Sequence, residues 1–168
     1  MDFYDELVVL KTIERSGWRR KKIDGRIESD AEHTFSMLLM AMKMMWKHEL
    51  GLDQLKVLKM IAVHELGEID VGDITPFDGI STEQKHAAEL AAVQRIAEQY
   101  EWPEAEKLWT EFEEAGTKEA RFVKALDKYD AVKQAQNYER RGLAPAGTAD
   151  EFFKSAQAAV DRLTDLDD

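Results

Sequence analysis

Apolar side chains recur every three or four residues along most of this chain, which is the spacing that places them on one face of an α-helix. No segment alternates apolar and polar residues over the length of a strand. The pattern therefore predicts an all-α fold. Start and stop signals divide it into seven helices, at about residues 4–16, 29–47, 52–69, 81–100, 104–115, 117–141 and from 148 onward.

Polar segments connect the predicted helices. Residues 18–29 read as a linker, and residues 71–80 read as a loop that contains two glycines and a proline. Capping boxes, in which two side chains satisfy the free N–H groups at a helix start, are expected at Ser29 with Glu32, Ser81 with Gln84 and Thr148 with Glu151. No internal repeat or second-domain linker interrupts the chain, so residues 1–168 are expected to form a single bundle of about seven helices.

Charge and composition limit the partners of this chain. A net charge of −11 disfavours a nucleic-acid polymer, although a locally positive pocket can still take a small anion. The longest apolar run, residues 35–46, is interrupted by Lys43 and is too short to cross a membrane. The N-terminus lacks the features of a signal peptide, and the absence of cysteine suits a reducing compartment. A cytoplasmic protein without a membrane partner is therefore expected.

Ionisable side chains crowd the end of the helix predicted at residues 52–69, in the stretch IAVHELGEIDVGDITP. His64, Glu65 and Glu68 lie on or beside its apolar face. One such charge would read as a solvated residue at a helix end. Several together are unusual, because an ionised group near a core needs a partner or a metal.

The same pattern occurs on two other predicted helices. His33 lies on a stripe with methionines in the helix at residues 29–47, and Asp127 and Asp130 continue the apolar stripe of the helix at residues 117–141. His33 alone would more often be a hydrogen-bonded core residue than a metal ligand. Two histidines, a neighbouring carboxylate and a distant aspartate could meet, however, if these three helices pack side by side.

Imidazole and carboxylate groups together suit a divalent transition metal. Water bound to such an ion loses a proton easily and becomes a nucleophile near neutral pH. Glu68 and Asp73, outside the ligand set, could orient this water or protonate a leaving group. The motif HELGE does not match the H-E-x-x-H zinc motif of proteases, because Glu68 stands at the position of its second histidine.

Three motifs in this order resemble the HD-domain metal-dependent phosphohydrolases, and among them the 5′-deoxynucleotidases. The segments are EHTFSM, VHELGEIDVGD and ALDKYDAV, and the resemblance extends over about residues 18–130. It implies an HD-domain bundle that holds one divalent ion, which could be Mn, Co, Fe, Zn or Mg. The metal ligands that it implies are His33, His64, Glu65 and Asp127.

The resemblance also implies roles for residues around the ion. Glu68 and Asp73 fall where the family has a catalytic glutamate and a catalytic aspartate. The segment SGWRR resembles one that lies near the base and phosphate of the substrate, and EQKH resembles one near the phosphate. The substrate-binding residues expected from these two segments are Trp18, Arg19, Arg20 and Lys85.

One position departs from the family pattern. The chain has a His-Glu pair, His64 and Glu65, where the family has His-Asp. Glutamate keeps the carboxylate but extends it by one methylene group, so its oxygen must reach the ion from a different backbone position. The site could bind metal with adjusted geometry, prefer another metal, or have lost tight binding, and a working site is the interpretation we favour.

The expected function is hydrolysis of a small nucleotide, in the first place a deoxyribonucleoside 5′-monophosphate. A nucleoside triphosphate or another phosphoester would require the same chemistry. A module that binds metal or nucleotide without turnover is the alternative of another class. By its resemblance to known relatives, the chain could also form a homodimer.

Overall fold

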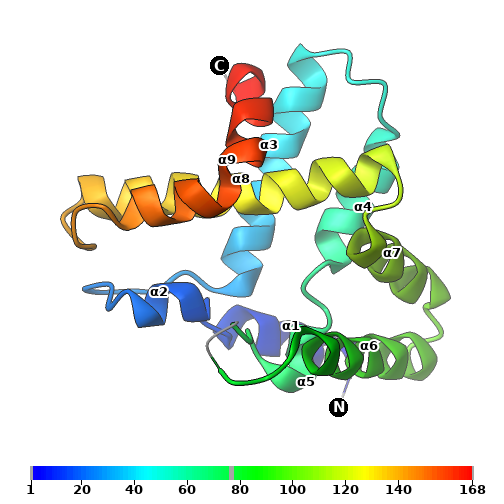
Figure 1. The fold of residues 1–168 in the computed structure, drawn as a ribbon. Helices are drawn as coiled ribbons and strands as arrows, with labels where there is room; N and C mark the ends of the chain where they lie inside the picture. The colour runs from blue at the N-terminus through cyan, green and yellow to red at the C-terminus, as the bar shows by residue number, and fades with distance from the viewer. Residues whose placement is uncertain (1, 76–77, 168) are drawn as a thin grey trace.

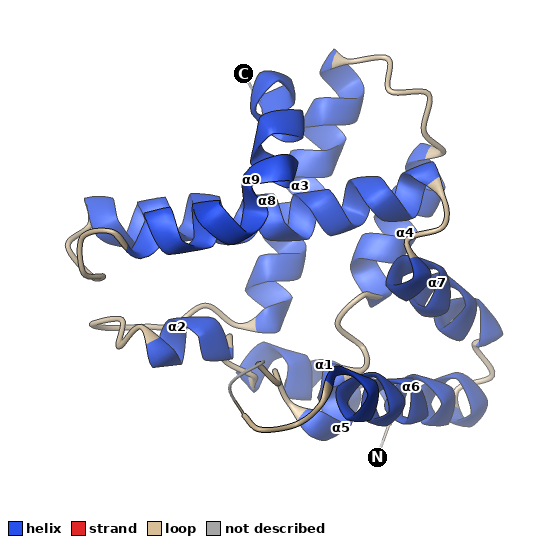
Figure 2. Ribbon diagram, viewed as in Figure 1, coloured by secondary structure: helices blue, strands red, loops and turns tan. Residues whose placement is uncertain are grey.

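The computed structural model describes residues 2–75 and 78–167 and confirms the predicted all-α class (Figures 1 and 2). Nine helices occur within these ranges. They are α1 (Phe3–Thr12), α2 (Ser16–Arg20), α3 (Asp30–Lys47), α4 (Gln54–Val63), α5 (Glu68–Val71), α6 (Thr82–Gln99), α7 (Pro103–Glu114), α8 (Lys118–Arg140) and α9 (Thr148–Asp167). None of these described helices is long and apolar enough to span a membrane.

Two short helices account for the difference from the predicted number of seven. The helix expected at residues 52–69 is interrupted, because α4 ends at Val63, residues 64–67 form turns, and α5 begins at Glu68. α2 replaces part of the linker expected at residues 18–29. Trp18 in α2 is only 2% exposed, and the burial of this indole orders a segment whose composition alone reads as a loop.

Helix caps fix two of the predicted starts. Ser29 caps α3 and Ser81 caps α6, and each belongs to a complete capping box with the residue three positions later. α9 also begins at Thr148, as predicted, but the capping box expected there with Glu151 is wrong, because the Thr148 hydroxyl donates to the carbonyl oxygen of Pro145 and the Glu151 N–H donates to that of Gly147. The cap at Ser29 matters for function, because it sets the start of the helix that carries His33.

α8 is the helix around which the others are arranged. α3, α4, α7 and α9 pack against it, and α1, α5 and α6 lie together at one end of the molecule (Figure 1). The main core joins these helices through residues such as Met37, Met60, Ile96, Trp109 and Leu126. A second, smaller core joins α2 to α8 and α9, and consists of Trp18, Ile23, Ala135, Tyr138 and Ala149.

A close approach between the α4–α5 turn and α6 explains the glycine of the HELGE motif. A Cβ atom on Gly67 would lie 2.7 Å from the Cβ of Glu89 and 3.2 Å from its Cα. The second contact is with backbone, which cannot move without shifting α6. Gly67 therefore permits α5, which begins at Glu68, to pack on α6.

We expect Gly67→Ala to lower the free energy of unfolding by about 1–3 kcal/mol, because the added methyl group overpacks this contact. Gly116→Ala is the matched control, since a Cβ atom at Gly116 meets nothing within 4 Å. Denaturant unfolding of the two variants and the wild type measures the difference. Equal stability of the two variants would show that α6 does not constrain the turn.

Candidate active site

Four ligand-type side chains from three helical segments meet beside α8. His33 comes from α3, His64 and Glu65 follow the end of α4, and Asp127 comes from α8. One nitrogen or oxygen atom from each lies within 4.8 Å of the others. Ligand atoms roughly 2.0–2.2 Å from one ion lie no more than about 4.4 Å apart, so small side-chain movements suffice to share an ion. The structure thus brings together the four residues that the resemblance implied as ligands.

Both imidazole rings are oriented through their Nδ1 atoms. Nδ1 of His64 lies 2.6 Å from the carbonyl oxygen of Ile61, and Nδ1 of His33 lies 2.6 Å from Oδ2 of Asp130. A proton kept on each Nδ1 would leave both Nε2 lone pairs to a bound ion, which would displace the proton that the raised pKa of His33 places on its Nε2. Nε2 of His64 is buried and has no hydrogen-bond partner among the described residues. This is the arrangement that metal-binding histidines adopt, so the donor set fits a divalent ion.

The carboxylate of Glu65 lies at the centre of this cluster despite its extra methylene group. Its Oε1 is 3.3 Å from Nε2 of His64 and 3.7 Å from Nε2 of His33. Oδ1 of Asp127 is 3.1 Å from the same nitrogen of His33. The longer side chain therefore still directs an oxygen toward both histidines, which is what adjusted metal geometry requires.

Arg15 belongs to the site and was missed by the sequence analysis. Its guanidinium group forms an ion pair with Oε1 of Glu65, and its Nη2 is 3.6 Å from Oδ1 of Asp127. The sequence placed Arg15 inside the first helix, but α1 ends at Thr12 and an isolated bridge between Glu14 and Ser29 redirects the chain. The signal that could have found Arg15 was its position just before SGWRR.

Opposite charges within the cluster shift the pKa values of its members. Burial and the Arg15 charge lower the pKa of His33, but its hydrogen bonds with Asp127 and Asp130 outweigh them and raise it to about 10. Burial raises the pKa of Asp127, but the hydrogen bond and the charge of His33 bring it to about 2. Burial likewise opposes ionisation of Glu65, yet His64 and Arg15 hold the pKa of this carboxyl well below its usual range. Both carboxylates are therefore available as ionised ligands.

A second group of carboxyls, Asp30, Glu68 and Asp73, adjoins the cluster, with one oxygen of each within 4.8 Å of the others. Burial and the charges of Glu65 and Asp73 raise the pKa of Glu68 to about 12. Burial and the charge of Glu65 raise the pKa of Asp30 to about 7. Glu68 is thus a proton donor at neutral pH, a state that a nearby cation would shift toward ionisation.

Asp73 connects this cluster of three carboxyl side chains to α2. Its Oδ2 accepts a hydrogen bond of 2.6 Å from the backbone N–H of Ser16, and its carbonyl oxygen accepts one of 2.7 Å from the Ser16 hydroxyl. These two bonds hold the loop after α5 against the start of α2. They also fix Asp73 between the two cavities of the site.

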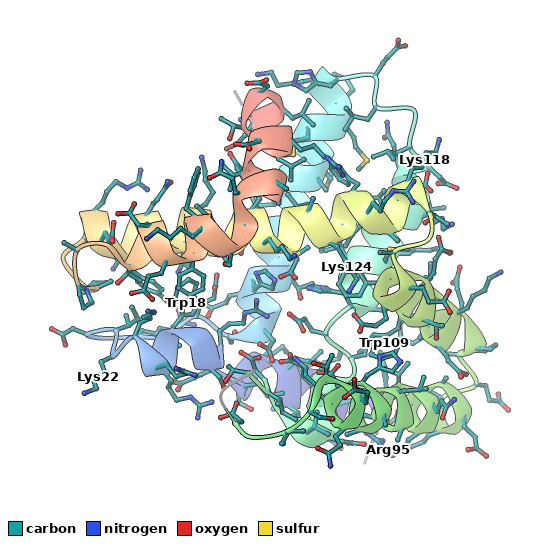
Figure 3. The ribbon with its side chains drawn as sticks, in the orientation of Figure 1. Trp18, Lys22, Arg95, Trp109, Lys118 and Lys124 are labelled. Carbon is teal, nitrogen blue, oxygen red and sulfur yellow. The ribbon has the colours of Figure 1, made fainter. Side chains whose placement is uncertain are left out.

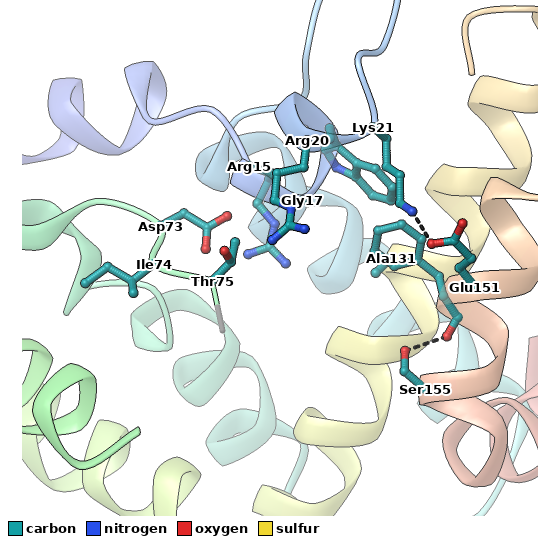
Figure 4. A pocket seen from close by; sticks show the side chains of 12 residues that line it. Arg15, Gly17, Arg20, Lys21, Asp73, Ile74, Thr75, Ala131, Glu151 and Ser155 are labelled. Carbon is teal, nitrogen blue, oxygen red and sulfur yellow. Dashed lines mark hydrogen bonds and ion pairs between the residues drawn. The ribbon is translucent and has the colours of Figure 1, made fainter. Parts of the chain in front are cut away.

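Two cavities share Arg15 and Asp73 as lining residues. The inner cavity, of about 200 Å³, contains His64, Glu65, Glu68 and Asp127. The outer pocket, of about 740 Å³, lies between α2, the loop after α5, α8 and α9 (Figure 4). Its apolar wall includes Ala131 and Phe152, and the ion pair of Lys21 with Glu151 lies at its edge.

The substrate-binding residues expected from SGWRR occupy two different environments. Trp18 and Arg20 line the outer pocket, whereas Arg19 lines neither cavity and its guanidinium group donates to Ser16 and Glu14. The ring of Trp18 packs against Phe152 and Tyr138, and its N–H donates to Glu28. With 2% exposure, Trp18 offers little surface for direct contact with a substrate, so its substrate-binding role stays a prediction from the sequence (Figure 3).

The segment EQKH contributes one residue to the inner cavity. Lys85 lines it, donates a hydrogen bond of 2.8 Å to the carbonyl oxygen of Ile74, and lies 3.3 Å from Glu89. Lys124 also lines this cavity, and sequence reasoning missed it. It precedes Asp127 by one turn of α8, and its Nζ is 2.9 Å from Oε1 of Glu113 (Figure 3).

Comparison with known proteins agrees with this geometry. The family model described as "HD domain" matches residues 8–164. The 5′-deoxynucleotidase HDDC2 of Dictyostelium discoideum is 34% identical over 149 residues, which cover 84% of this chain and 78% of that protein. The 5′-deoxynucleotidase hdd1 of Schizosaccharomyces pombe is 36% identical over 146 residues, which cover 83% and 72%. The chain belongs to the HD-domain family of phosphohydrolases, which confirms the family expected from its motifs.

Solved structures show the same fold. A conserved hypothetical protein from Pyrococcus furiosus superposes with a TM-score of 0.77 at 26% identity, covering 98% of this chain and 96% of that one. A protein from Magnetospirillum magnetotacticum, described as a "predicted metal-dependent phosphohydrolase", superposes with a TM-score of 0.68 at 25% identity, covering 98% and 93%. The arrangement of helices that positions the cluster is therefore common to these proteins.

The buried carboxyl of Asp30 predicts a pH dependence of stability. Its pKa rises from 3.8 to about 7 on folding, so the stability that this group contributes is complete below pH 3.8 and is lost as the pH rises through 7. Asp30→Asn replaces the titrating carboxyl by a neutral amide, so the variant does not lose stability in this way as the pH rises. We expect its melting temperature relative to wild type, without metal, to be higher at pH 8 than at pH 4.5 by about 2 °C or more. A difference that does not vary with pH would mean that Asp30 is not protonated in the folded chain.

Proposed function

We propose that this chain hydrolyses deoxyribonucleoside 5′-monophosphates with one divalent ion held by His33, His64, Glu65 and Asp127. The observation that carries the proposal is the convergence of these two imidazoles and two carboxylates within 4.8 Å. Relatives at 34–36% identity are named 5′-deoxynucleotidases, which supports the choice of substrate. A divalent ion at these ligands would supply a bound water of lowered pKa and polarise the phosphate.

Basic side chains of the inner cavity are suited to bind the phosphate group. Arg15, from the segment before α2, lines it together with Lys85 of α6 and Lys124 of α8. Arg15 presents a planar guanidinium fork, which pairs with two phosphate oxygens at once. Six carboxyl residues line the same cavity, and each of the three cations pairs with one of them, so a phosphate dianion would be held here by these cations together with the divalent ion.

Glu68 and Asp73 are suited to handle protons around the phosphate. Glu68 carries a proton on its own buried carboxyl and can give it to the leaving oxygen of the nucleoside. Asp73 lies where the two cavities meet, with its carboxylate held by the N–H of Ser16, and can accept a proton from the attacking water. Burial of Glu68 at 4% exposure keeps bulk water from replacing it as the donor.

The outer pocket is suited to the nucleoside. Its volume of about 740 Å³ is within the range of pockets that hold small organic ligands. Phe152 and Ala131 supply apolar contact for the base, and Arg20 stands among the polar groups of the lining. Trp18 supports this wall from behind by its packing on Phe152.

Phosphate release from a panel of nucleotides tests the proposal. Wild type should release phosphate from deoxyribonucleoside monophosphates in preference to triphosphates. Glu68→Gln keeps the size of the side chain but removes the transferable proton, so turnover should fall by about 10²-fold or more while metal content stays unchanged. Glu65→Gln should instead lose metal, because a neutral amide is a poor ligand for a divalent ion.

Metal content and phosphate release are measured on the same preparations, with Glu83→Gln on the exposed face of α6 as the control. Normal turnover by Glu68→Gln, or full metal content in Glu65→Gln, would contradict this division of roles. No release from any nucleotide with manganese, cobalt, magnesium or zinc supplied would favour the alternative of a regulatory module. The homodimer and the cytoplasmic location stay predictions from the sequence.

A further inference from the structure

A pocket outside the catalytic site is lined by positive charge. It has a volume of about 220 Å³ and lies between the turn after α7, α8 and α9. Four of its lining residues are basic and none is acidic. The basic residues are Arg121, Lys124, Lys128 and Arg162. In a chain with 34 acidic and 23 basic residues, such a concentration of one sign is not expected of a random surface hollow.

Helical spacing places these residues on two facing surfaces. Arg121, Lys124 and Lys128 follow one face of α8 at intervals of three and four residues, and Ser155 and Arg162 lie on one face of α9 seven residues apart. The positions between them hold alanines, among them Ala125, Ala158 and Ala159. Small side chains at the centre and long cations at the edges produce a hollow whose rim is basic.

Most of this charge is not neutralised by neighbouring carboxylates. Lys128 and Arg162 form no ion pair with any residue in the described part of the chain. Arg121 donates hydrogen bonds to the carbonyl oxygens of Gly116, at 2.9 Å, and of Ala115, which are neutral acceptors. Lys124 is the exception, because it pairs with Glu113. Three of the four cations therefore keep their full charge toward the pocket.

We propose that the α8–α9 pocket binds a phosphate group, as free phosphate or as the phosphate of a small ester. Arginine forks and lysine ammonium groups at close quarters are the side chains that recognise phosphate oxygens. The volume of about 220 Å³ accommodates a phosphate group and is below the usual range of pockets that enclose larger organic ligands, which is roughly 300–1,000 Å³. The pocket shares Lys124 with the inner cavity, so a phosphate bound here lies directly behind the wall of the catalytic site. The binding itself does not depend on the proposed hydrolysis.

Alanine methyl groups provide local probes for this binding. In protein labelled with ¹³C at the alanine methyls, titration with inorganic phosphate at constant ionic strength should shift the signals of Ala158 and Ala159 saturably. Ala41, buried on α3, serves as the internal reference. The double variant Lys128→Ala, Arg162→Ala should weaken this response by about tenfold or more, because two charge-assisted contacts are lost.

The control is the double variant Arg140→Ala, Lys154→Ala, which removes one exposed cation from each of the same two helices outside the pocket. Ala158→Leu fills the hollow without changing its charge and should also abolish the response of Ala159, the probe that remains in this variant. A deoxyribonucleoside monophosphate in place of phosphate, titrated into metal-free protein so that it is not hydrolysed, assigns the source, since tighter binding of the ester points to nucleotide and weaker binding to free phosphate. No shift at Ala158 and Ala159 up to about 10 mM phosphate, or an equal response in both double variants, would overturn the proposal.

Discussion

The buried carboxylate of Glu65 is the constraint around which the site is organised. One of its oxygens is shared by the guanidinium group of Arg15 and faces the Nε2 atoms of both histidines. A buried negative charge of this kind is tolerated only with several cationic or hydrogen-bonding partners. Those partners come from the segment before α2, from α3 and from the end of α4, so satisfying one carboxylate determines how three segments meet.

The buried charge of Glu65 also helps to explain why the neighbouring carboxyls have raised pKa values. Burial and the charge of ionised Glu65 make a further negative charge nearby unfavourable, and both raise the pKa values of Glu68 and Asp30. Two sets of acidic groups with opposite protonation thus lie side by side. One set is suited to hold a cation and the other to transfer a proton, which is the separation of roles that hydrolysis of a phosphate ester requires.

Sequence periodicity and caps were sufficient to predict the fold class and the starts of α3 and α6, because these depend on local spacing. The set of residues that converge came from the resemblance to the HD-domain family. Periodicity failed where contacts between distant segments determine the local structure. The turn at Gly67 depends on the approach of α6, and the order of α2 depends on burial of Trp18. Lys124 was missed because a basic residue within a helix has no local signature, and Arg15, although next to SGWRR, was assigned to the first helix; their roles appear only when distant carboxylates and cavities surround them.

Anomalous diffraction from crystals of the cobalt-loaded protein tests the central claim most directly. The account predicts one peak between α3, α4 and α8, with Nε2 of His33, Nε2 of His64 and an oxygen each of Glu65 and Asp127 at roughly 2.0–2.2 Å from the ion. A peak elsewhere, or an ion from which Glu65 is absent as a ligand, would contradict it. In that case the glutamate would have replaced the aspartate of the family without keeping its function.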